Sequence, residues 1–137
     1  MEAVLESLTA GFPVLLLHFL VTVTMLAVGV VIYLWMTPYP ELELIRNGNI
    51  AAAISLGAAI LSLAIPLAFS MSVSVSVIDI IAWGLVTLAV LLIVYRVIDF
   101  LMKDLPNRIE DGEMGPALLL ASVKLGVAAI TAAAVSG

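Results

Sequence analysis

The chain has 137 residues, of which 64% are hydrophobic and only 11% charged, and its formal net charge is −5. A soluble domain is about 45–50% apolar and about 25% charged, and one this short exposes much of its surface, so most of this chain must be solvated by lipid. The acidic balance argues against nucleic-acid binding, and the absence of cysteine excludes disulfides, thiol catalysis and Cys-based metal sites.

The first apolar run predicts a retained membrane-spanning helix over about 12–36. Glu2 and Glu6 precede it, where a secretory signal peptide would carry basic residues, and the run is longer than the apolar core of such a peptide. We expect the helix to end at residues 37–40, because Thr-Pro-Tyr-Pro contains two prolines that lack an N–H donor and cannot continue a helix.

Three further apolar runs predict helices over about 50–69, 77–102 and 116–135. A spanning helix needs about 20 apolar residues, which every run supplies. The alternating segment 71–76 is too short for a sheet and predicts a tight connection or a frayed helix end. The sequence thus predicts an all-α membrane protein with four transmembrane helices in a single integral membrane domain, 1–137.

The turns before the second and fourth helices predict an internal repeat of two tandem helix hairpins. Placing Ile45-Arg46-Asn47-Gly48 over Ile109-Glu110-Asp111-Gly112 brings two helices rich in small residues into register. Asn49 follows the first of these turns and offers a side-chain acceptor for an N-cap. Because small residues let membrane helices approach closely, we expect the helix over 50–69 to form the packing centre of the protomer or an oligomer interface.

The basic residues predict the orientation of the chain. Arg46, Arg96, Lys103 and Arg108 lie in or beside the loops after the first and third helices, whereas the opposite end carries no Lys or Arg. Because basic residues stay on the cytoplasmic side, both termini are predicted to be non-cytoplasmic.

Lys124, near the middle of the last helix, is the residue whose insertion costs most, about 2.5–3.5 kcal/mol at a helix centre. It is either a buried site residue or a lysine whose stem extends along apolar surface to water. Asp79 is either its partner or a first-turn aspartate favoured by the helix dipole. Trp83, one turn after Asp79, lines an entry path or belongs to the interfacial aromatic belt.

His18 lies about one and a half turns inside the outer end of the first helix, where it is either a proton relay or a neutral hydrogen-bonded group. As the single histidine it excludes a His-cluster metal site within one protomer, although a ring of His18 in an oligomer stays open. Arg96 and Asp99, three residues apart, are expected to pair. No metal or cofactor site is predicted, and the absence of a nucleotide loop or nucleophile–base pair argues against an enzyme.

Two groups of residues carry a family resemblance: the run TPYPELELIRNGN over residues 37–49, and Asp79 with Trp83-Gly84. Together they resemble the YjfL-like bacterial inner-membrane proteins, catalogued as domain of unknown function 350. The resemblance implies a small bacterial inner-membrane protein of paired helix hairpins with an envelope or polyamine-linked role, and Lys124 departs from its pattern. The residues that the motif carries over are Glu41, Arg46, Asn47, Gly48, Asn49, Asp79 and Trp83.

Two functions remain open at this stage. One is a homo-oligomeric channel or transporter for a small cation or polyamine-like solute, with Asp79, Lys124, His18 and Trp83 along the path. The alternative is a membrane scaffold without transport that recruits a cytoplasmic envelope-stress partner through its loops. The first of these loops carries Glu41, Glu43, Arg46, Asn47, Gly48 and Asn49. The simpler interpretation of both loops is a solvated acidic rim without a partner.

Overall fold

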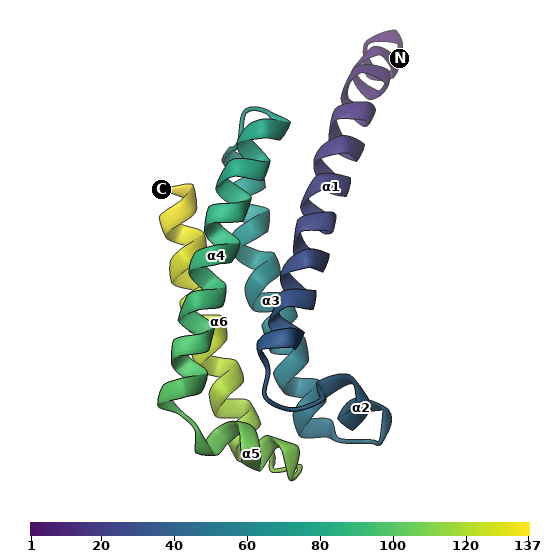
Figure 1. Ribbon diagram of the computed structural model, residues 1–137. Coiled ribbons are helices and arrows are strands. Elements are labelled where there is room, and N and C mark those ends of the chain that lie inside the picture. The colour runs from purple at the N-terminus through teal and green to yellow at the C-terminus, as the bar shows by residue number, and fades with distance from the viewer.

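The computed structural model describes all 137 residues, and all of its regular secondary structure is helical (Figure 1). The predicted all-α fold is confirmed, because four helices are long and apolar enough to cross a membrane. These long helices are α1 (Glu2–Met36), α3 (Ile50–Val73), α4 (Val77–Leu101) and α6 (Met114–Ser136). The short helices α2 (Glu41–Arg46) and α5 (Asp104–Glu110) lie at one end of the bundle, here called the loop end, and both termini lie at the other, the terminal end (Figure 1).

The observed bounds differ from the predicted ones in three places. Helix α1 begins at Glu2 rather than near residue 12, since nothing before the apolar run breaks a helix. Helix α3 continues to Val73, so half of the alternating 71–76 segment is helical. Two segments expected to be loops form α2 and α5, each held by a residue buried against the bundle, Glu41 in α2 and Ile109 in α5.

The chain consists of two units with the same order, a long helix, a short helix and a long helix. Gly48 and Gly112 end the two short helices with φ values of +89° and +85°, a conformation that glycine adopts without steric cost. The same three backbone hydrogen bonds close both turns. They run from Asn47 to Glu43, Gly48 to Ile45 and Asn49 to Leu44, and again from Asp111 to Asn107, Gly112 to Ile109 and Glu113 to Arg108. This likeness supports the predicted repeat, which as a gene duplication stays a prediction.

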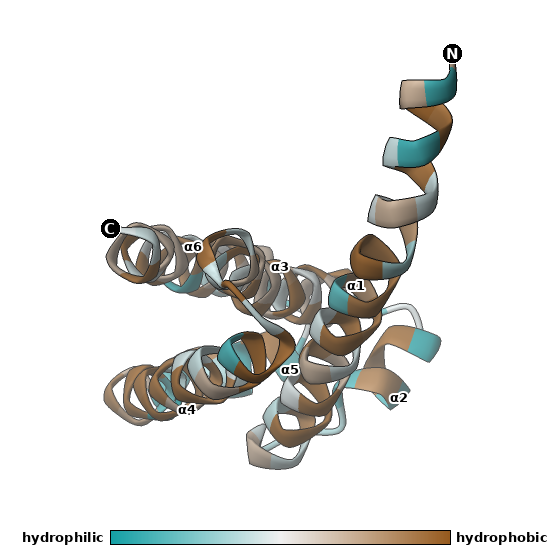
Figure 2. Cartoon of the chain, turned by 90° about the horizontal axis from the view of Figure 1, so that it is seen from above, coloured by the Kyte–Doolittle hydropathy of each residue, from teal (hydrophilic) through white to brown (hydrophobic).

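Helices α3 and α6 pack along their length at the centre of the protomer (Figure 2). Alanines are buried along the contact, among them Ala52 and Ala59 on α3 and Ala117 and Ala128 on α6. Small side chains allow this close approach, as predicted for the small-residue helix. Helix α1 meets the bundle only through its second half, where Met25, Gly29 and Tyr33 are its buried residues, and its first turns stand clear of the other helices.

Asn49 links the two units at the loop end. Its Oδ1 accepts a hydrogen bond from the backbone N–H of Ala52 at 3.0 Å, which caps α3 as the sequence predicted. Its Nδ2 donates to the carbonyl oxygens of Ile109 and Glu110, both at 3.1 Å, at the end of α5. One side chain therefore satisfies backbone groups in both short-helix turns.

We predict that Asn49→Ala lowers the free energy of unfolding by about 2–3 kcal/mol, because it removes an N-cap and leaves two carbonyl acceptors without a donor. Thermal unfolding of the detergent-purified protein, followed by circular dichroism, measures the loss. Asn47→Ala is the matched control, since Asn47 is exposed and its side chain makes no hydrogen bond. Equal melting temperatures for the two variants would contradict the role given to Asn49.

Candidate functional site in the membrane-spanning bundle

Lys124 of α6 is buried, with 1% of its surface exposed, and it lies at the centre of a charged and aromatic cluster. Its Nζ lies 3.3 Å from Oδ1 of Asp99 on α4 and donates a hydrogen bond to the hydroxyl of Tyr33 on α1 at 2.6 Å. The ammonium also lies 4.6 Å from the ring centroid of Tyr33 and 5.6 Å from that of Tyr95, within the range of a cation–π interaction. Two helices, α1 and α4, therefore supply the surroundings of a cation carried by a third, α6.

The position of Lys124 follows from the direction of its helix. Side chains on an α-helix lean toward its N-terminus, so the stem of Lys124 extends toward the loop end. There it meets Asp99 near the end of α4, whereas Asp79 near the start of α4 lies at the terminal end and is not its partner. The expected Arg96–Asp99 pair is wrong, because Arg96 Nη1 instead donates to the carbonyl oxygen of Met36 at 3.3 Å.

Tyr95 fixes the three central helices at the level of Lys124. Its side chain is fully buried, and its hydroxyl lies 3.3 Å from the carbonyl oxygen of Ser62 on α3 and 3.4 Å from that of Lys124 on α6. One donor thus serves two backbone acceptors on neighbouring helices. Because Tyr95 and Asp99 are four residues apart, they occupy the same face of α4 and bracket the lysine.

Glu41 adds a second buried carboxylate beside this cluster. It is 2% exposed, and neither of its carboxylate oxygens completes a hydrogen bond. Burial raises its pKa from 4.5 to about 7, while the Tyr39 hydroxyl and the charge of Lys124 lower that pKa by smaller amounts. Tyr39 and Ser55 stand beside it, with their hydroxyl oxygens 3.4 Å apart. A carboxyl group that changes charge near neutral pH therefore lies at the loop end of the bundle.

Two surface pockets at the loop end are lined by the residues that carry the two carboxylates. A pocket of about 240 Å³ is lined by Asp99 together with Arg96 and Lys103. Another, of about 310 Å³, is lined by Glu41 and its neighbour Tyr39. Both oxygens of Glu41 and Oδ1 of Asp99 are covered, so each pocket ends close to its carboxylate without exposing these atoms.

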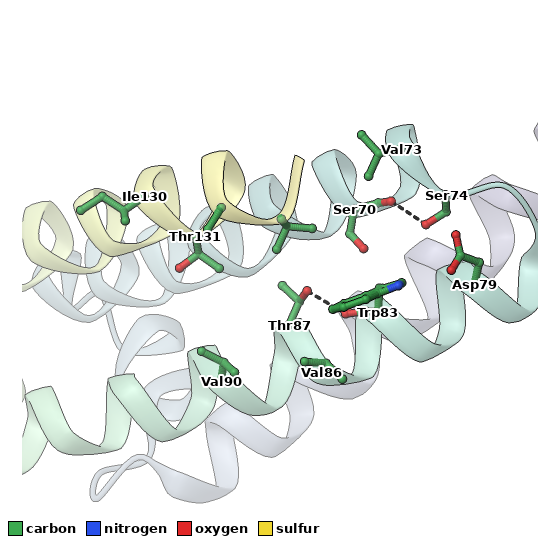
Figure 3. A pocket seen from close by; sticks show the side chains of 12 residues that line it. Ser70, Val73, Ser74, Asp79, Trp83, Val86, Thr87, Val90, Ile130 and Thr131 are labelled. Atoms are coloured by element: carbon green, nitrogen blue, oxygen red, sulfur yellow. Dashed lines mark hydrogen bonds between the residues drawn. The ribbon is translucent and has the colours of Figure 1, made fainter. Parts of the chain in front are cut away.

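Asp79 and Trp83 lie at the terminal end, in the wall of a separate pocket of about 420 Å³ between α3, α4 and α6 (Figure 3). Ser76 caps α4, because its Oγ accepts a hydrogen bond from the backbone N–H of Asp79 at 3.2 Å, and Oδ2 of Asp79 in turn accepts from the N–H of Val75 at 3.0 Å. Asp79 thus lies in the first turn of α4 and also lines a pocket, so both interpretations of it stay open. Trp83 is more than half exposed.

His18 stands apart from both sites. It lies on the half of α1 that leaves the bundle, it is half-buried, and its side chain makes no hydrogen bond or ion pair. No three His, Asp or Glu side chains gather as a metal site would require. Of the loop motif, Glu43, Arg46, Asn47 and Gly48 are exposed, so only Glu41 and Asn49 face the interior.

Most of the residues in this cluster could not be predicted from the sequence. Tyr33, Tyr39, Ser55 and Tyr95 were not singled out, because tyrosine and serine are common in membrane helices and nothing in their local sequence marks them. One feature of the sequence did point to this cluster. Tyr95 and Asp99 are four residues apart on one face of the third predicted helix, at about the depth that the side chain of Lys124 reaches when it extends toward the loop end.

We predict that Lys124→Met destabilises the protein by about 3–5 kcal/mol, because Asp99 then remains buried without a counter-charge. The double variant Lys124→Met/Asp99→Asn should recover most of this loss, since no charge is left unpaired. Melting temperatures of the four proteins in a double-mutant cycle measure the coupling. Arg108→Gln, which breaks the exposed ion pair with Glu113, is the control and should leave the melting temperature unchanged.

We also predict that Glu41 makes stability depend on pH. The folded protein binds this proton more tightly than the unfolded chain, so the stabilisation is complete below pH 4.5 and is lost as the pH rises through about 7. Glu41→Gln should flatten the melting temperature over this window. Glu43→Gln, at an exposed position two residues on, should not, and an identical pH profile for wild type and Glu41→Gln would refute the assignment.

Comparison with known proteins identifies the family. The family described as Domain of Unknown Function (DUF350) matches residues 7–135. Relatives named UPF0719 inner membrane protein YjfL, from Escherichia coli strain K12 and Escherichia coli O157:H7, are each 28% identical over 108 residues, or 79% of this chain and 82% of theirs. No solved structure matches significantly. The family match spans almost the whole chain, four of its helices are long and apolar enough to cross a membrane, and the relatives are named inner membrane proteins. The chain therefore belongs to the DUF350 family and is a multi-pass inner-membrane protein.

Proposed function

We propose that this protein moves a small cation across the membrane along the interior of α3, α4 and α6. The observation that supports it is the buried pair of Lys124 and Asp99 beside a second carboxylate, Glu41, inside a bundle that lipid surrounds. Ionisable groups at such depth are costly and are typical of ion and proton pathways.

The residues along the three helices support a path that is closed at its middle. From the terminal end, the pocket with Asp79 gives way to a layer of fully buried apolar residues, Leu63, Leu91 and Ala128. The next turns toward the loop end carry Tyr95 and the cluster around Lys124. A largely apolar pocket with one carboxylate, a buried apolar layer and a charged cluster inside one protomer correspond to an occluded state. This path does not require the predicted homo-oligomer, which stays a prediction.

The chemistry of the cluster suggests how a cation would be handled. Lys124 occupies the carboxylate of Asp99 in the resting protein, so an arriving cation competes with the ammonium for the same oxygen atoms. Glu41 titrates near neutral pH and can release a proton as positive charge enters the cluster. In this proposal the loop end faces the cytoplasm, in keeping with the basic residues there.

The scaffold alternative rests on the exposed part of the loop motif. Glu43, Arg46 and Asn47 are accessible at the loop end, but Glu41, which that hypothesis also needed on the surface, is buried. The buried charges inside the bundle have no place in that hypothesis, so transport is the function that we favour.

The test is flux into proteoliposomes containing the pH-sensitive dye pyranine, with Na⁺, K⁺ or methylammonium added outside. We expect wild-type vesicles to couple the entry of one of these cations to a change in internal pH, and Lys124→Met and Asp99→Asn to slow it at least tenfold.

Two controls separate loss of function from loss of fold. Arg108→Gln should transport like the wild type, and Lys124→Met/Asp99→Asn should fold well yet transport poorly. No difference between wild-type and empty vesicles would reject the transport proposal. Undiminished flux in the folded double variant would reject the cluster as its path.

A further inference from the structure

The pocket at the terminal end carries a single charge that nothing neutralises. Asp79 is the only ionisable residue among those that line it, and it forms no ion pair. The five lysines and arginines of the chain are elsewhere, four near the loop end and Lys124 paired with Asp99. The carboxylate therefore gives this pocket a negative potential, which favours a positively charged occupant.

Hydrogen bonding within the pocket leaves it rich in acceptors. The hydroxyls of Ser74, Thr87 and Thr131 donate to the carbonyl oxygens of Ser70, Trp83 and Val127 at 2.7, 2.7 and 2.8 Å. Their protons are thus engaged, and only their lone pairs remain for a ligand. With the oxygens of Asp79, these hydroxyls match a ligand that brings several N–H donors.

Ser70 is the second, independent sign of a ligand. Its side chain is 1% exposed, its Oγ has no hydrogen-bond partner, and Figure 3 shows it directed into the space bounded by Trp83 and Thr131. A buried hydroxyl left without a partner costs about 1–3 kcal/mol, although an acceptor on its own helix would be easy to reach. An occupant of the pocket would remove that cost.

We propose that this pocket binds a primary ammonium group carried on a short apolar chain. The ammonium would pair with Asp79 and donate to the hydroxyl oxygens, while the apolar chain lies against Trp83 and Val90. A volume of about 420 Å³ is far larger than a bare metal ion requires. Such a group can come from a free amine or from the ethanolamine headgroup of a lipid. Binding does not require that the cation crosses the membrane, so the inference stands apart from the transport proposal.

The experiment uses the intrinsic fluorescence of Trp83. Trp35→Phe removes the other tryptophan, which is exposed, and leaves Trp83 as the single reporter in the full-length protein. In detergent, n-butylammonium chloride should change its emission with saturation, whereas 1-butanol and n-butyltrimethylammonium, which lack the ammonium N–H donors, should not. Asp79→Asn, which keeps an acceptor for the helix cap, should raise the Kd at least tenfold, and Ser70→Ala about threefold.

Controls define what would overturn the proposal. Asp104→Asn, at an exposed carboxylate on α5, should leave the Kd unchanged. A non-saturating response, an equal response to 1-butanol, or an unchanged Kd in Asp79→Asn would each reject the site.

Nanodiscs distinguish the two sources of the ammonium group. If a lipid headgroup occupies the pocket, replacing phosphatidylcholine by phosphatidylethanolamine should raise the apparent Kd for n-butylammonium in wild type through competition. If a free amine is the ligand, the Kd should be the same in both lipids. Either result supports an ammonium site and identifies its source.

Discussion

The burial of one ammonium group determines much of this structure. Removing a charge from water costs several kcal/mol even after the protein relaxes, and that cost is offset only where a counter-charge and further polar contacts are in place. Lys124 obtains a carboxylate from α4, a hydroxyl from α1 and two aromatic faces. Tyr33 is one of only three buried residues on α1, so the cation also holds the most loosely packed helix against the bundle.

The two structural units share the order of their helices and the geometry of their turns, but their side chains differ. The alignment that superposes their turns places Ile60 of α3 opposite Lys124 of α6, and Ile60 is 36% exposed on the outside of the bundle whereas Lys124 is buried. The position equivalent to Asn49 in the second unit is Glu113. Its side chain pairs with Arg108 of the same unit, whereas Asn49 bridges to the other unit. The repeated architecture therefore supplies the helices and their close contact, and the candidate site arises where the two halves differ.

Hydropathy and turn chemistry were enough to predict four helices, the cap at Asn49 and the unusual cost of Lys124, because each depends on local sequence. The partner of Lys124 depends on which end of the bundle its side chain reaches. The position of Lys124 along its own helix did not decide between Asp79 and Asp99 as the partner. The tilt of helical side chains toward the helix N-terminus does, because it directs Lys124 toward the loop end. Glu41 could not be assigned in advance, because in a loop rich in acids nothing but the packing of α2 distinguishes the buried carboxylate from its exposed neighbour Glu43.

The carboxylates at the two ends of the bundle differ in whether a cation is bound to them. At the loop end the carboxylate of Asp99 is already occupied by the cation of Lys124, while at the terminal end Asp79 has no cation and the surrounding hydroxyls present lone pairs. A layer of fully buried apolar side chains, Leu63, Leu91 and Ala128, lies between them along α3, α4 and α6. Under the transport proposal, movement past this layer would have to be coupled to release of Lys124 from Asp99, because a second cation cannot share that carboxylate without repulsion from the ammonium.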